Sequence, residues 1–378
     1  MRIAIVTETF LPHVNGVTNS VLRILDHLQS RGDEAVVLAP GRAGDVPAEV
    51  NGYPIVPLGA VPLPGYRDFR VGTGTSRTLE TALRSFRPDV VHLAAPFLLG
   101  HRGLLAAGRL DLPTVAVYQT DVPSYAARYR LAIAEPLLWG RVRQIHQLAT
   151  LTLAPSTAAQ RQLLARGVPR VELWGRGVDT DRFHPRHRDE SWRTAVAPGR
   201  RIIGYVGRLA PEKQVEDLTV LADLPLTTTV VVGDGPSRAY LERALPRAHF
   251  TGQLGGSDLS RVLASFDLFV HPGELETFGQ ALQEALASGV PVIAPAKGGP
   301  LDIIAPSRTG WLYPPGRLDV LRTRVVDLVG DDAKRRAFGE AARAATLTAT
   351  WESVCDDLLS HYERAMSAHQ RRRQAHAV

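Results

Sequence analysis

The chain has 378 residues, 44% of them hydrophobic, and its 44 Lys and Arg against 38 Asp and Glu give a formal net charge of +6. A chain of this length and composition has room for about two domains, each with its own core, which excludes a disordered chain and a small disulfide-stapled module. Cys355 is the single cysteine, which excludes an internal disulfide and a cysteine-based zinc cluster and fits a reducing compartment.

Short apolar segments alternate with helical patterns through the first half of the chain. Residues 3–6 form the first segment, and an apolar stripe at helical spacing follows from Val17 to Leu28 and stops at Gly32. Further apolar segments lie at residues 35–38, 90–93, 114–117 and 151–154. None of them alternates as a half-solvated strand does, so we expect parallel strands buried on both faces and right-handed crossovers. Residues 58–74 are rich in proline and glycine and are expected to form a long loop.

The pattern restarts after a polar stretch rich in proline and arginine at residues 184–201, which we expect to be a linker. Buried-type strands follow at residues 202–206, 229–232, 268–270 and 292–294. The sequence therefore predicts two α/β domains with parallel sheets, residues 1–187 and 198–351. In such domains ligands bind beyond the carboxyl ends of the strands, and two domains facing each other would create a cleft.

The N-terminal apolar run is interrupted at Glu8, which makes it too short for a signal peptide or a membrane span, and we expect a cytoplasmic protein. The excess of basic residues fits either anionic partners or a solvated basic surface. We expect no nucleic-acid partner, and the sequence leaves the oligomeric state open. One segment mixes apolar and cationic residues: Leu131, Ile133, Leu137, Leu138 and Trp139 among Arg128, Arg130, Arg141 and Arg143. It fits peripheral contact with an anionic membrane, or a helix with one buried face and solvated arginines.

Several catalytic signatures are absent from the sequence: G-x-G-x-x-G opening the first helix, G-x-x-x-x-G-K-[ST], G-x-S-x-G and H-E-x-x-H. Hydride transfer, P-loop phosphoryl transfer, serine esterase chemistry and zinc proteolysis are therefore disfavoured. Asp179-Thr180-Asp181 looks like a D-x-D metal motif, but its place after Gly175-Arg176-Gly177-Val178 predicts a turn. His92, His101 and His249 lie in or near apolar runs and are interpreted as structural, and we expect no metal site.

Two glycine-containing loops suit an anionic ligand. Asn15-Gly16-Val17 lies where the first strand leads into the first helix, so backbone N–H groups there could approach an anion, although plain turn chemistry gives the same pattern. Gly207-Arg208 follows the first strand of the second domain, with Lys213 five residues further on. A guanidinium fork and an ammonium suit a diphosphate without a metal, while a surface ion-pair cluster is the other interpretation.

A pair of glutamates, Glu276 and Glu284, marks a third segment, preceded by His271-Pro272-Gly273. Thr277 and Gln280 fit a capping box, which predicts a helix starting there with Glu276 just outside and Glu284 two turns inside. The helical rise puts the carboxylates about 10–12 Å apart. That distance exceeds the separation of the two catalytic carboxylates in both retaining and inverting glycosidases. The two glutamates therefore fit the ends of one extended ligand better than an acid–base couple. The other interpretation is that either one is a solvent-facing carboxylate of the helix.

Taken together, these segments resemble glycosyltransferase family 4, retaining enzymes with two Rossmann-like domains of the type called GT-B. The resemblance rests on Asn15-Gly16-Val17, Gly175-Arg176-Gly177-Val178-Asp179, Val206-Gly207-Arg208 with Lys213, Gly233-Asp234-Gly235-Pro236, Glu276 with Glu284, and Gly298-Gly299-Pro300. It implies an α/β fold, a nucleotide sugar as substrate with no cofactor or metal, and a C-terminal helix at about 352–378 that returns to the first domain.

The same resemblance implies roles for individual residues. Arg208 and Lys213 would clamp the donor diphosphate, Glu276 would bind hydroxyls of the transferred sugar, and Glu284 would bind the ribose. The remaining donor-site candidates are Gly16, Gly207, Gly252, Gln253, Leu254, Phe278 and Gly279, and the acceptor-site candidates are Asn15, Tyr66, Arg67 and Arg70.

The sequence departs from the family pattern at Gln119, where many relatives carry a histidine in a segment like Tyr-His-Thr. Gln119 can hydrogen-bond a sugar hydroxyl but cannot carry a proton near neutral pH, which leaves Asp121 as the candidate for electrostatic support or for orienting the acceptor. With its Gln-Thr-Asp-Val segment, the chain resembles actinobacterial GDP-mannose-dependent α-mannosyltransferases that act on glycolipids.

The favoured hypothesis is therefore retaining transfer of a hexose, with mannose from GDP-mannose as donor and a (glyco)lipid as acceptor. An alternative is a UDP- or other NDP-sugar with a soluble acceptor such as a secondary metabolite, whose pocket residues 58–74 would shape. Two other classes stay open. A sugar-nucleotide epimerase would need a proton-abstracting group that Gln119 does not supply, and a non-catalytic nucleotide-binding protein is disfavoured because the clamp and the carboxylate pair are intact.

Overall fold

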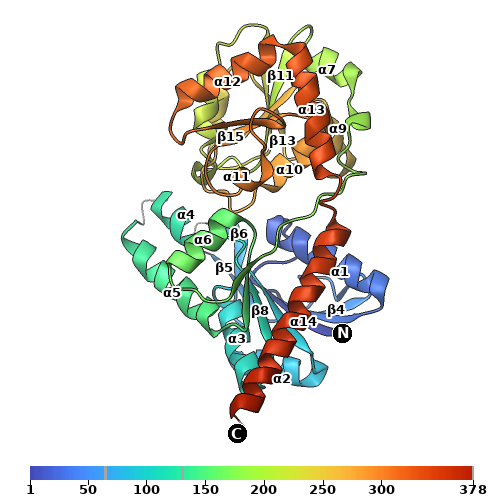
Figure 1. Ribbon diagram of the computed structural model, residues 1–378, viewed down its shortest axis with the longest axis vertical. Coiled ribbons are helices and arrows are strands. Elements are labelled where there is room, and N and C mark those ends of the chain that lie inside the picture. Colours follow the sequence, from blue (N-terminus) through green and yellow to red (C-terminus); the bar gives the residue numbers. More distant parts are fainter. Residues whose placement is uncertain (64–65, 129–131, 377–378) are drawn as a thin grey trace. The chain divides into compact units, whose positions relative to one another are not determined.

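The computed structural model describes residues 1–63, 66–128 and 132–376, with the backbone alone at residues 62–63, 66–70, 126–128, 132 and 376. Within it the chain divides into two compact units, each containing its own parallel sheet (Figure 1). Unit 1 comprises Met1–Pro123, Ala134–Gly175 and Glu352–Val378, and unit 2 comprises Ser124–Ile133 and Arg176–Trp351.

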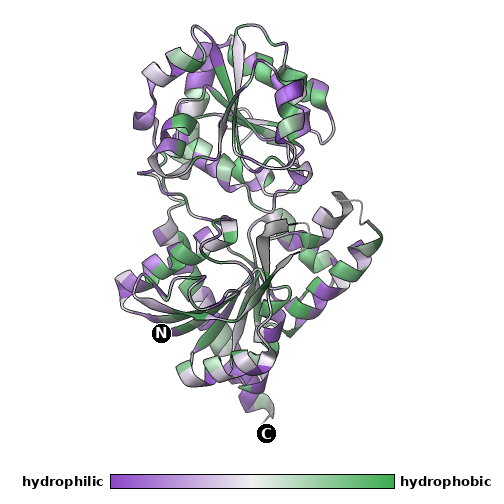
Figure 2. Cartoon of the chain, turned by 180° about the vertical axis from the view of Figure 1, so that it is seen from behind, coloured by the Kyte–Doolittle hydropathy of each residue, from purple (hydrophilic) through white to green (hydrophobic). Residues whose placement is uncertain are grey.

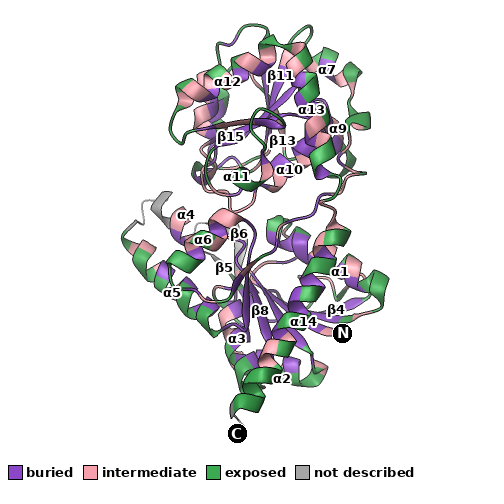
Figure 3. Cartoon of the chain, in the orientation of Figure 1, coloured by how far each residue is buried: buried purple, intermediate pink, exposed green. Residues whose placement is uncertain are grey.

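Unit 1 contains an eight-stranded sheet in which described neighbours pair in parallel, except for an antiparallel hairpin at one edge. In spatial order its strands are β10 (Val171–Leu173), β9 (Leu151–Ala154), β8 (Thr114–Val117), β7 (Val90–Ala94), β1 (Arg2–Thr7), β2 (Glu34–Ala39), β4 (Tyr53–Pro57) and β3 (Glu49–Val50). The five apolar segments predicted in this half are confirmed as strands β1, β2, β7, β8 and β9. They are central strands of the sheet and carry little but buried side chains (Figure 3).

Helices cover this sheet and complete its core. They are α1 (Gly16–Arg31), α2 (Ser76–Phe86), α3 (Leu99–Arg109), α5 (Glu135–Leu148), α6 (Thr157–Ala165) and α14 (Trp351–His376). Most of α4 (Val122–Arg128) and of the 3-10 turn η1 (Ala132–Ala134) falls in the segment Ser124–Ile133, which belongs to unit 2. The predicted apolar stripe of α1 is buried, and the helix ends where Gly32 takes the left-handed conformation, φ 74°. Among the described residues, no helix combines the length and apolar composition needed to cross a membrane.

The segment at residues 58–74, for which we expected a loop, instead contains a small antiparallel sheet. Strands β5 (Ala60–Leu63) and β6 (Tyr66–Gly72) pair with Ala60 opposite Gly72. Its end is fastened to α3, because Nη1 of Arg102 donates to the carbonyl oxygens of Gly72 and Gly74 at 3.1 and 3.0 Å. Proline and glycine hide the two-residue period of strands, which is why the sequence did not predict this hairpin.

Unit 2 contains a six-stranded parallel sheet with helices on both faces. Its strands, in spatial order, are β13 (His249–Gly252), β12 (Thr227–Val232), β11 (Arg201–Val206), β14 (Leu268–Val270), β15 (Val292–Pro295) and β16 (Gly310–Tyr313). Its helices are α8 (Arg238–Ala244), α9 (Gly256–Ala264), α10 (Gln280–Ala287), α11 (Pro300–Ile303), α12 (Leu318–Gly330) and α13 (Asp332–Thr346), with 3-10 segments η3 (Pro211–Lys213) and η4 (Val215–Leu221). Two hydrophobic clusters contain side chains of the sheet and of the helices that cover it, and the strands are correspondingly hydrophobic (Figure 2).

Residues 184–201, for which we expected a linker, lie within unit 2 instead. They form the 3-10 turn η2 (Pro185–His187) and the helix α7 (Glu190–Val196). Trp192 and Val196 of this helix pack against the core of unit 2. The stretch is polar and basic because most side chains of α7 face solvent, and this composition suggested a linker. The two apolar contacts nevertheless hold the helix on the unit.

Candidate functional site

The predicted donor residues of unit 2 follow the carboxyl ends of its central strands, where parallel sheets place their ligand sites. Gly207 and Arg208 come directly after β11, and Lys213 ends the 3-10 turn η3. Glu276 lies in the loop between β14 and α10. Because β11 and β14 are neighbours in the sheet, these two loops meet.

The two loops are joined by an ion pair between Nζ of Lys213 and Oε1 of Glu276. Both side chains are largely buried, with 21% and 13% of their surface exposed. Burial alone would raise the pKa of the Glu276 carboxyl, but the charge of Lys213 and the contact with His271 hold that pKa well below its usual range. Burial alone would lower the pKa of Lys213, and the charge of Glu276 raises it instead. Both groups are therefore charged at neutral pH, which gives the site one fixed cation and one fixed anion.

A third residue at this point, His271, was not among the predicted site residues. It lies directly after β14, and its Nε2 is 2.9 Å from Oε1 of Glu276. Its ring stacks on that of Tyr205, with centroids 6.0 Å apart and planes 12° from parallel. The signal in the sequence was the triplet His271-Pro272-Gly273, which we noted without assigning it a role.

Arg208, the other predicted clamp residue, is half exposed. Its Nη1 is 3.6 Å from Oε1 of the buried Glu212, and its carbonyl oxygen accepts a hydrogen bond of 3.0 Å from the hydroxyl of Tyr205. Burial raises the pKa of Tyr205, so this hydroxyl stays protonated and can donate. Gly207 has φ 157°, and a Cβ there would lie 2.7 Å from the same hydroxyl oxygen, so the turn requires glycine.

The predicted capping box is wrong. Helix α10 begins at Gln280 with Gly279 as its N-cap, and no side chain in the described chain caps it. Nε2 of Gln280 instead donates to the carbonyl oxygen of Gly177 at 3.1 Å. The backbone before the helix is held by a neighbouring loop, because the N–H of Gly299 donates to the carbonyl oxygen of Glu276 at 2.8 Å. A Cβ at residue 299 would lie 1.8 Å from the carbonyl oxygen of Phe278, so this close approach requires glycine.

The remaining donor candidates lie along the same edge of the sheet. Glu284 is the fifth residue of α10 and is partly exposed; its predicted distance from Glu276 stays a prediction. Gly252 ends β13 with φ 75°, and its carbonyl oxygen accepts from the N–H of Gly233 at 2.9 Å. Gln253 is exposed, whereas Leu254 packs against the core.

Sequence reasoning also missed a second carboxylate in this loop, Glu274. Its Oε2 accepts from Nζ of Lys297 at 3.1 Å, and its backbone N–H donates to Oε1 of Gln214 at 2.9 Å. Only tertiary contacts reveal it, because Gln214 and Lys297 are distant in the sequence.

In unit 1 the predicted residues also follow strand ends. Asn15 caps α1, its Oδ1 accepting from the N–H groups of Val17 and Thr18 at 3.0 Å, and Gly16 is the exposed first residue of that helix. Gln119 and Asp121 follow β8 and are both buried. Oδ2 of Asp121 accepts a hydrogen bond of 3.2 Å from Nε2 of Gln162. Tyr66, Arg67 and Arg70 lie in β6, where their side chains are outside the described structure.

The residues interpreted as structural make contacts within their own units. Oδ1 of Asp179 accepts from the N–H of Arg182 at 3.0 Å and closes the predicted turn. His92 is fully buried, and its Nδ1 is 2.8 Å from the hydroxyl of Tyr362. His101 contacts Arg141, and His249 meets the ring of Trp192. Within the described ranges there is no group of three or more His, Cys, Asp or Glu that could hold a metal ion.

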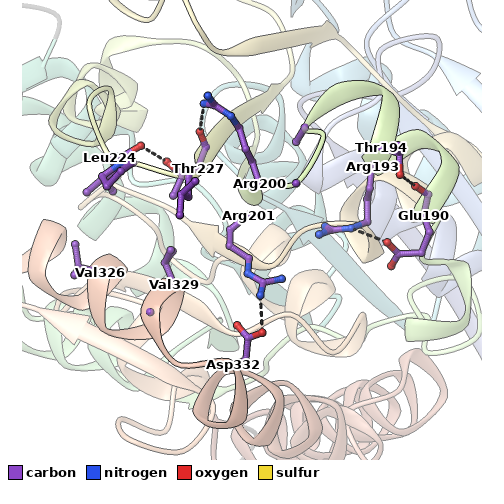
Figure 4. Close-up of a pocket in the computed structure, with 15 residues that line it drawn as sticks. Glu190, Arg193, Thr194, Arg200, Arg201, Leu224, Thr227, Val326, Val329 and Asp332 are labelled. Atoms are coloured by element: carbon purple, nitrogen blue, oxygen red, sulfur yellow. Dashed lines mark hydrogen bonds and ion pairs between the residues drawn. The ribbon is translucent and has the colours of Figure 1, made fainter.

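Unit 2 also has a pocket of about 700 Å³ at the opposite, amino-terminal edge of its sheet (Figure 4). Arg201, at the start of β11, points toward Asp332, while Leu224, Val326 and Val329 supply an apolar side. Of the described residues that line it, none is a predicted site residue. The pocket is thus separate from the loops that carry Lys213 and Glu276.

Two comparisons of sequence cover nearly the whole chain. Residues 14–182 match Glycosyltransferase Family 4, and residues 187–345 match Glycosyl transferases group 1. The GDP-mannose-dependent alpha-mannosyltransferase of Mycolicibacterium smegmatis is 49% identical over 97% of this chain and 98% of its own length. That of Mycobacterium tuberculosis is 50% identical over 96% of each chain. The chain belongs to glycosyltransferase family 4.

The fold of this glycosyltransferase is confirmed as the predicted α/β architecture of the GT-B type, with two Rossmann-like domains. The structure of Anabaena Alr3699/HepE in complex with UDP superposes with a TM-score of 0.79, at 19% identity over 96% of this chain and 100% of that one. Sucrose-phosphate synthase from Thermosynechococcus elongatus superposes with a TM-score of 0.80, at 19% identity over 97% of this chain and 99% of that one. At this identity the likeness concerns the fold alone.

Proposed function

We propose that this glycosyltransferase transfers mannose from GDP-mannose, with α stereochemistry and retention at the anomeric carbon, to a (glyco)lipid acceptor. The observation that carries the donor is the 49% and 50% identity, over almost the full length, with enzymes described as GDP-mannose-dependent alpha-mannosyltransferases. A third, from Corynebacterium glutamicum, is 42% identical over 98% of this chain. Relatives with other names stand further away: 2-deoxystreptamine N-acetyl-D-glucosaminyltransferase of Streptomyces fradiae is 28% identical.

The charges of unit 2 support this chemistry. As the bond between sugar and diphosphate breaks, negative charge develops on the diphosphate, and Arg208 and Lys213 would stabilise it without a metal ion. Glu276 would accept hydrogen bonds from hydroxyls of the mannose, and Glu284 from the ribose. The diphosphate would take the proton of the acceptor hydroxyl on the front face of the sugar, so no protein nucleophile is required. The buried Gln119 would donate or accept a hydrogen bond, with the buried Asp121 as electrostatic support.

A donor and acceptor screen tests the proposal. The purified protein is given GDP-mannose, UDP-glucose or other sugar nucleotides, with glycolipid or soluble acceptors, and both the product and the released nucleotide are measured. We expect transfer from GDP-mannose to the glycolipid, unchanged by a metal chelator. Lys213→Ala and Glu276→Ala should each lower the transfer rate by about 100-fold, the scale of losing one group that stabilises developing charge.

Lys334→Ala is the matched control, because Lys334 pairs with Asp327 on the outer helices of unit 2 and should keep the full rate. Near-normal transfer by Lys213→Ala or Glu276→Ala would contradict the site assignment. Transfer from UDP-sugars to soluble acceptors alone would favour the alternative function.

We further propose that unit 1 touches an anionic membrane surface through the start of α5. Leu137, on α5, supports this, being 78% exposed; Ile133, in the turn η1 that precedes the helix and belongs to unit 2, is 99% exposed. Arg143 is exposed on the same helix, while Trp139 is buried in the core and does not take part. An amphipathic surface of this kind gains affinity from buried apolar area and from attraction to anionic headgroups.

Sedimentation with liposomes tests the membrane proposal. We expect the protein to sediment with anionic liposomes at low salt, less at high salt, and Leu137→Glu to weaken this several-fold because it removes apolar area and adds repulsion. Leu226→Glu is the control, since Leu226 is also an exposed leucine but belongs to unit 2. A protein that stays in the supernatant with anionic liposomes at low salt would refute the contact.

A further inference from the structure

One oxygen of Glu276 is shared by two donors. Nζ of Lys213 contacts Oε1, and Nε2 of His271 lies 2.9 Å from the same atom. A buried carboxylate with two donors is held in one orientation, because each contact restricts its rotation and opposes its return to water.

His271 is itself rigidly placed. The residue is 3% exposed, and its ring lies flat against the ring of Tyr205, which is fully buried. Gly273 closes the other side: a Cβ there would lie 2.9 Å from Nε2 of His271 and 3.2 Å from the carbonyl oxygen of Lys213. A side chain at residue 273 would therefore crowd Nε2 of His271, and glycine leaves this space open.

The surroundings of His271 also indicate where its proton lies. Among the described residues, Nδ1 and Nε2 are both buried without a hydrogen bond of good geometry, but Nε2 lies 2.9 Å from Oε1 of Glu276. A proton on Nδ1 of the neutral ring would be a buried donor without an acceptor, which is costly, whereas a proton on Nε2 can be donated to Oε1 of Glu276. We assign the proton to Nε2 on this ground.

Once the donor is bound, Lys213 cannot by itself hold the Glu276 carboxylate in place. The proposed function asks Lys213 to bind the diphosphate, which draws its ammonium toward a second, more highly charged anion. Glu276 must then stay ionised and oriented toward the sugar with weaker support from Lys213. The proposed function gives His271 no part in binding the diphosphate, so its contact with Oε1 can persist.

We propose that His271 is a positioning residue, which holds Glu276 in its sugar-binding orientation while Lys213 engages the donor diphosphate. This inference rests on the proposed function, since it uses the roles of Lys213 and Glu276 given there. It predicts that His271 contributes to binding of the sugar part of the donor and not to binding of the nucleotide.

The test compares two substitutions that separate the ring from its proton. His271→Phe keeps an aromatic ring on Tyr205 and removes the N–H, whereas His271→Gln loses the ring but keeps an amide N–H within reach of Glu276. Calorimetry measures affinity for GDP and for GDP-mannose, and steady-state assays give kcat and KM. His369→Phe, on α14 in unit 1, is the matched control.

We expect His271→Phe to bind GDP within about 3-fold of the unaltered protein, which also shows that it is folded. Its kcat/KM for GDP-mannose should fall by about 10- to 100-fold, the scale of a lost hydrogen bond to a charged group. His271→Gln should recover most of this loss. If His271 acts through Glu276, adding His271→Phe to Glu276→Gln should cause little further loss.

A His271→Phe enzyme with unchanged kcat/KM, an equal loss of GDP and GDP-mannose affinity, or a His271→Gln enzyme as poor as His271→Phe would overturn the inference. Failure of the proposed function has a different signature, because the unaltered protein would then not use GDP-mannose. In that case the same variants are compared on the sugar nucleotide that the unaltered protein does use. The ratio of nucleotide-sugar to nucleotide affinity then decides the role of His271.

Discussion

At the scale of single residues, the buried charges of unit 2 are satisfied by partners from distant parts of the chain. Asp267, directly before β14 and 4% exposed, shows this outside the donor site. Its Oδ2 is 2.8 Å from Nη2 of Arg193 and accepts from the N–H of Ile202 at 2.7 Å, and its Oδ1 is 3.1 Å from Nη2 of Arg188. These contacts fasten α7 to the sheet and explain why an arginine-rich stretch is part of the unit.

Replacing Asp267 by Asn should therefore destabilise the protein by about 2–4 kcal/mol, because Arg193 would remain buried without its main counter-charge. Burial alone would raise the pKa of Asp267, but Ile202, Arg193 and Arg188 together lower it. A carboxyl whose folded pKa is lowered stabilises the fold above its unfolded pKa and loses this contribution as pH falls through the folded value. Urea unfolding is measured at neutral pH and below about pH 4. Between these two conditions the free energy of unfolding should fall less for Asp267→Asn than for the unaltered protein.

Glu190→Gln is the control for this prediction. Glu190 also pairs with Arg188 and Arg193, but its side chain is exposed, so its loss should change stability by no more than about 0.5 kcal/mol. Equal effects of the two substitutions would contradict the role given to Asp267.

At the scale of secondary elements, α3 is capped by a side chain from another element. Within the described chain its N-cap residue, Leu98, makes no side-chain cap. Glu8, after β1, replaces it: Oε1 accepts from the N–H groups of Phe97, Leu98 and Gly100 at 2.7 to 2.9 Å. Its Oε2 accepts from the N–H of Leu99 at 3.1 Å. A carboxylate at the positive end of a helix is favourable, so Glu8 joins β1 to α3.

Glu8→Ala should destabilise unit 1 by about 2 kcal/mol, since it leaves the first N–H groups of α3 without acceptors. Glu8→Gln should cost less, because its amide oxygen still accepts but carries no charge. Denaturant unfolding measures both. Glu34→Ala is the control, because it removes an exposed carboxylate that pairs with Arg2. If Glu8→Ala lowers the free energy of unfolding by as little as Glu34→Ala does, the capping role of Glu8 is contradicted.

At the scale of the whole molecule, the chain makes two units and returns to the first. After unit 2 it enters α14, which lies with unit 1: Nε1 of Trp174 donates to the carbonyl oxygen of Val354 at 2.9 Å, and Tyr362 meets His92. The residues proposed for the donor lie mainly in unit 2, whereas Gln119 and Asp121 lie in unit 1. Each unit thus carries a part of the proposed chemistry at the carboxyl ends of its strands.

Much of this organisation was determined by the sequence alone. Continuous apolar segments such as residues 90–93 predict buried parallel strands because both faces of such strands must avoid water. The stripe of α1 and its stop at Gly32 follow from helical periodicity and from the left-handed cap that glycine permits. Arg208 and Lys213 could be named because their loop follows a predicted strand, and Glu276 because of its spacing from Glu284 and the family resemblance.

Tertiary structure alone decided the contacts between segments distant in the sequence. The start of α10 depends on Gly177 and Gly299, so the local capping pattern of Thr277 and Gln280 was overridden. The shared oxygen of Glu276 needs β11 and β14 to be neighbours, which no local pattern encodes. Local spacing specifies elements because its physics acts within a few residues, whereas hydrogen bonds and ion pairs between loops exist only after the sheet has set its strand order.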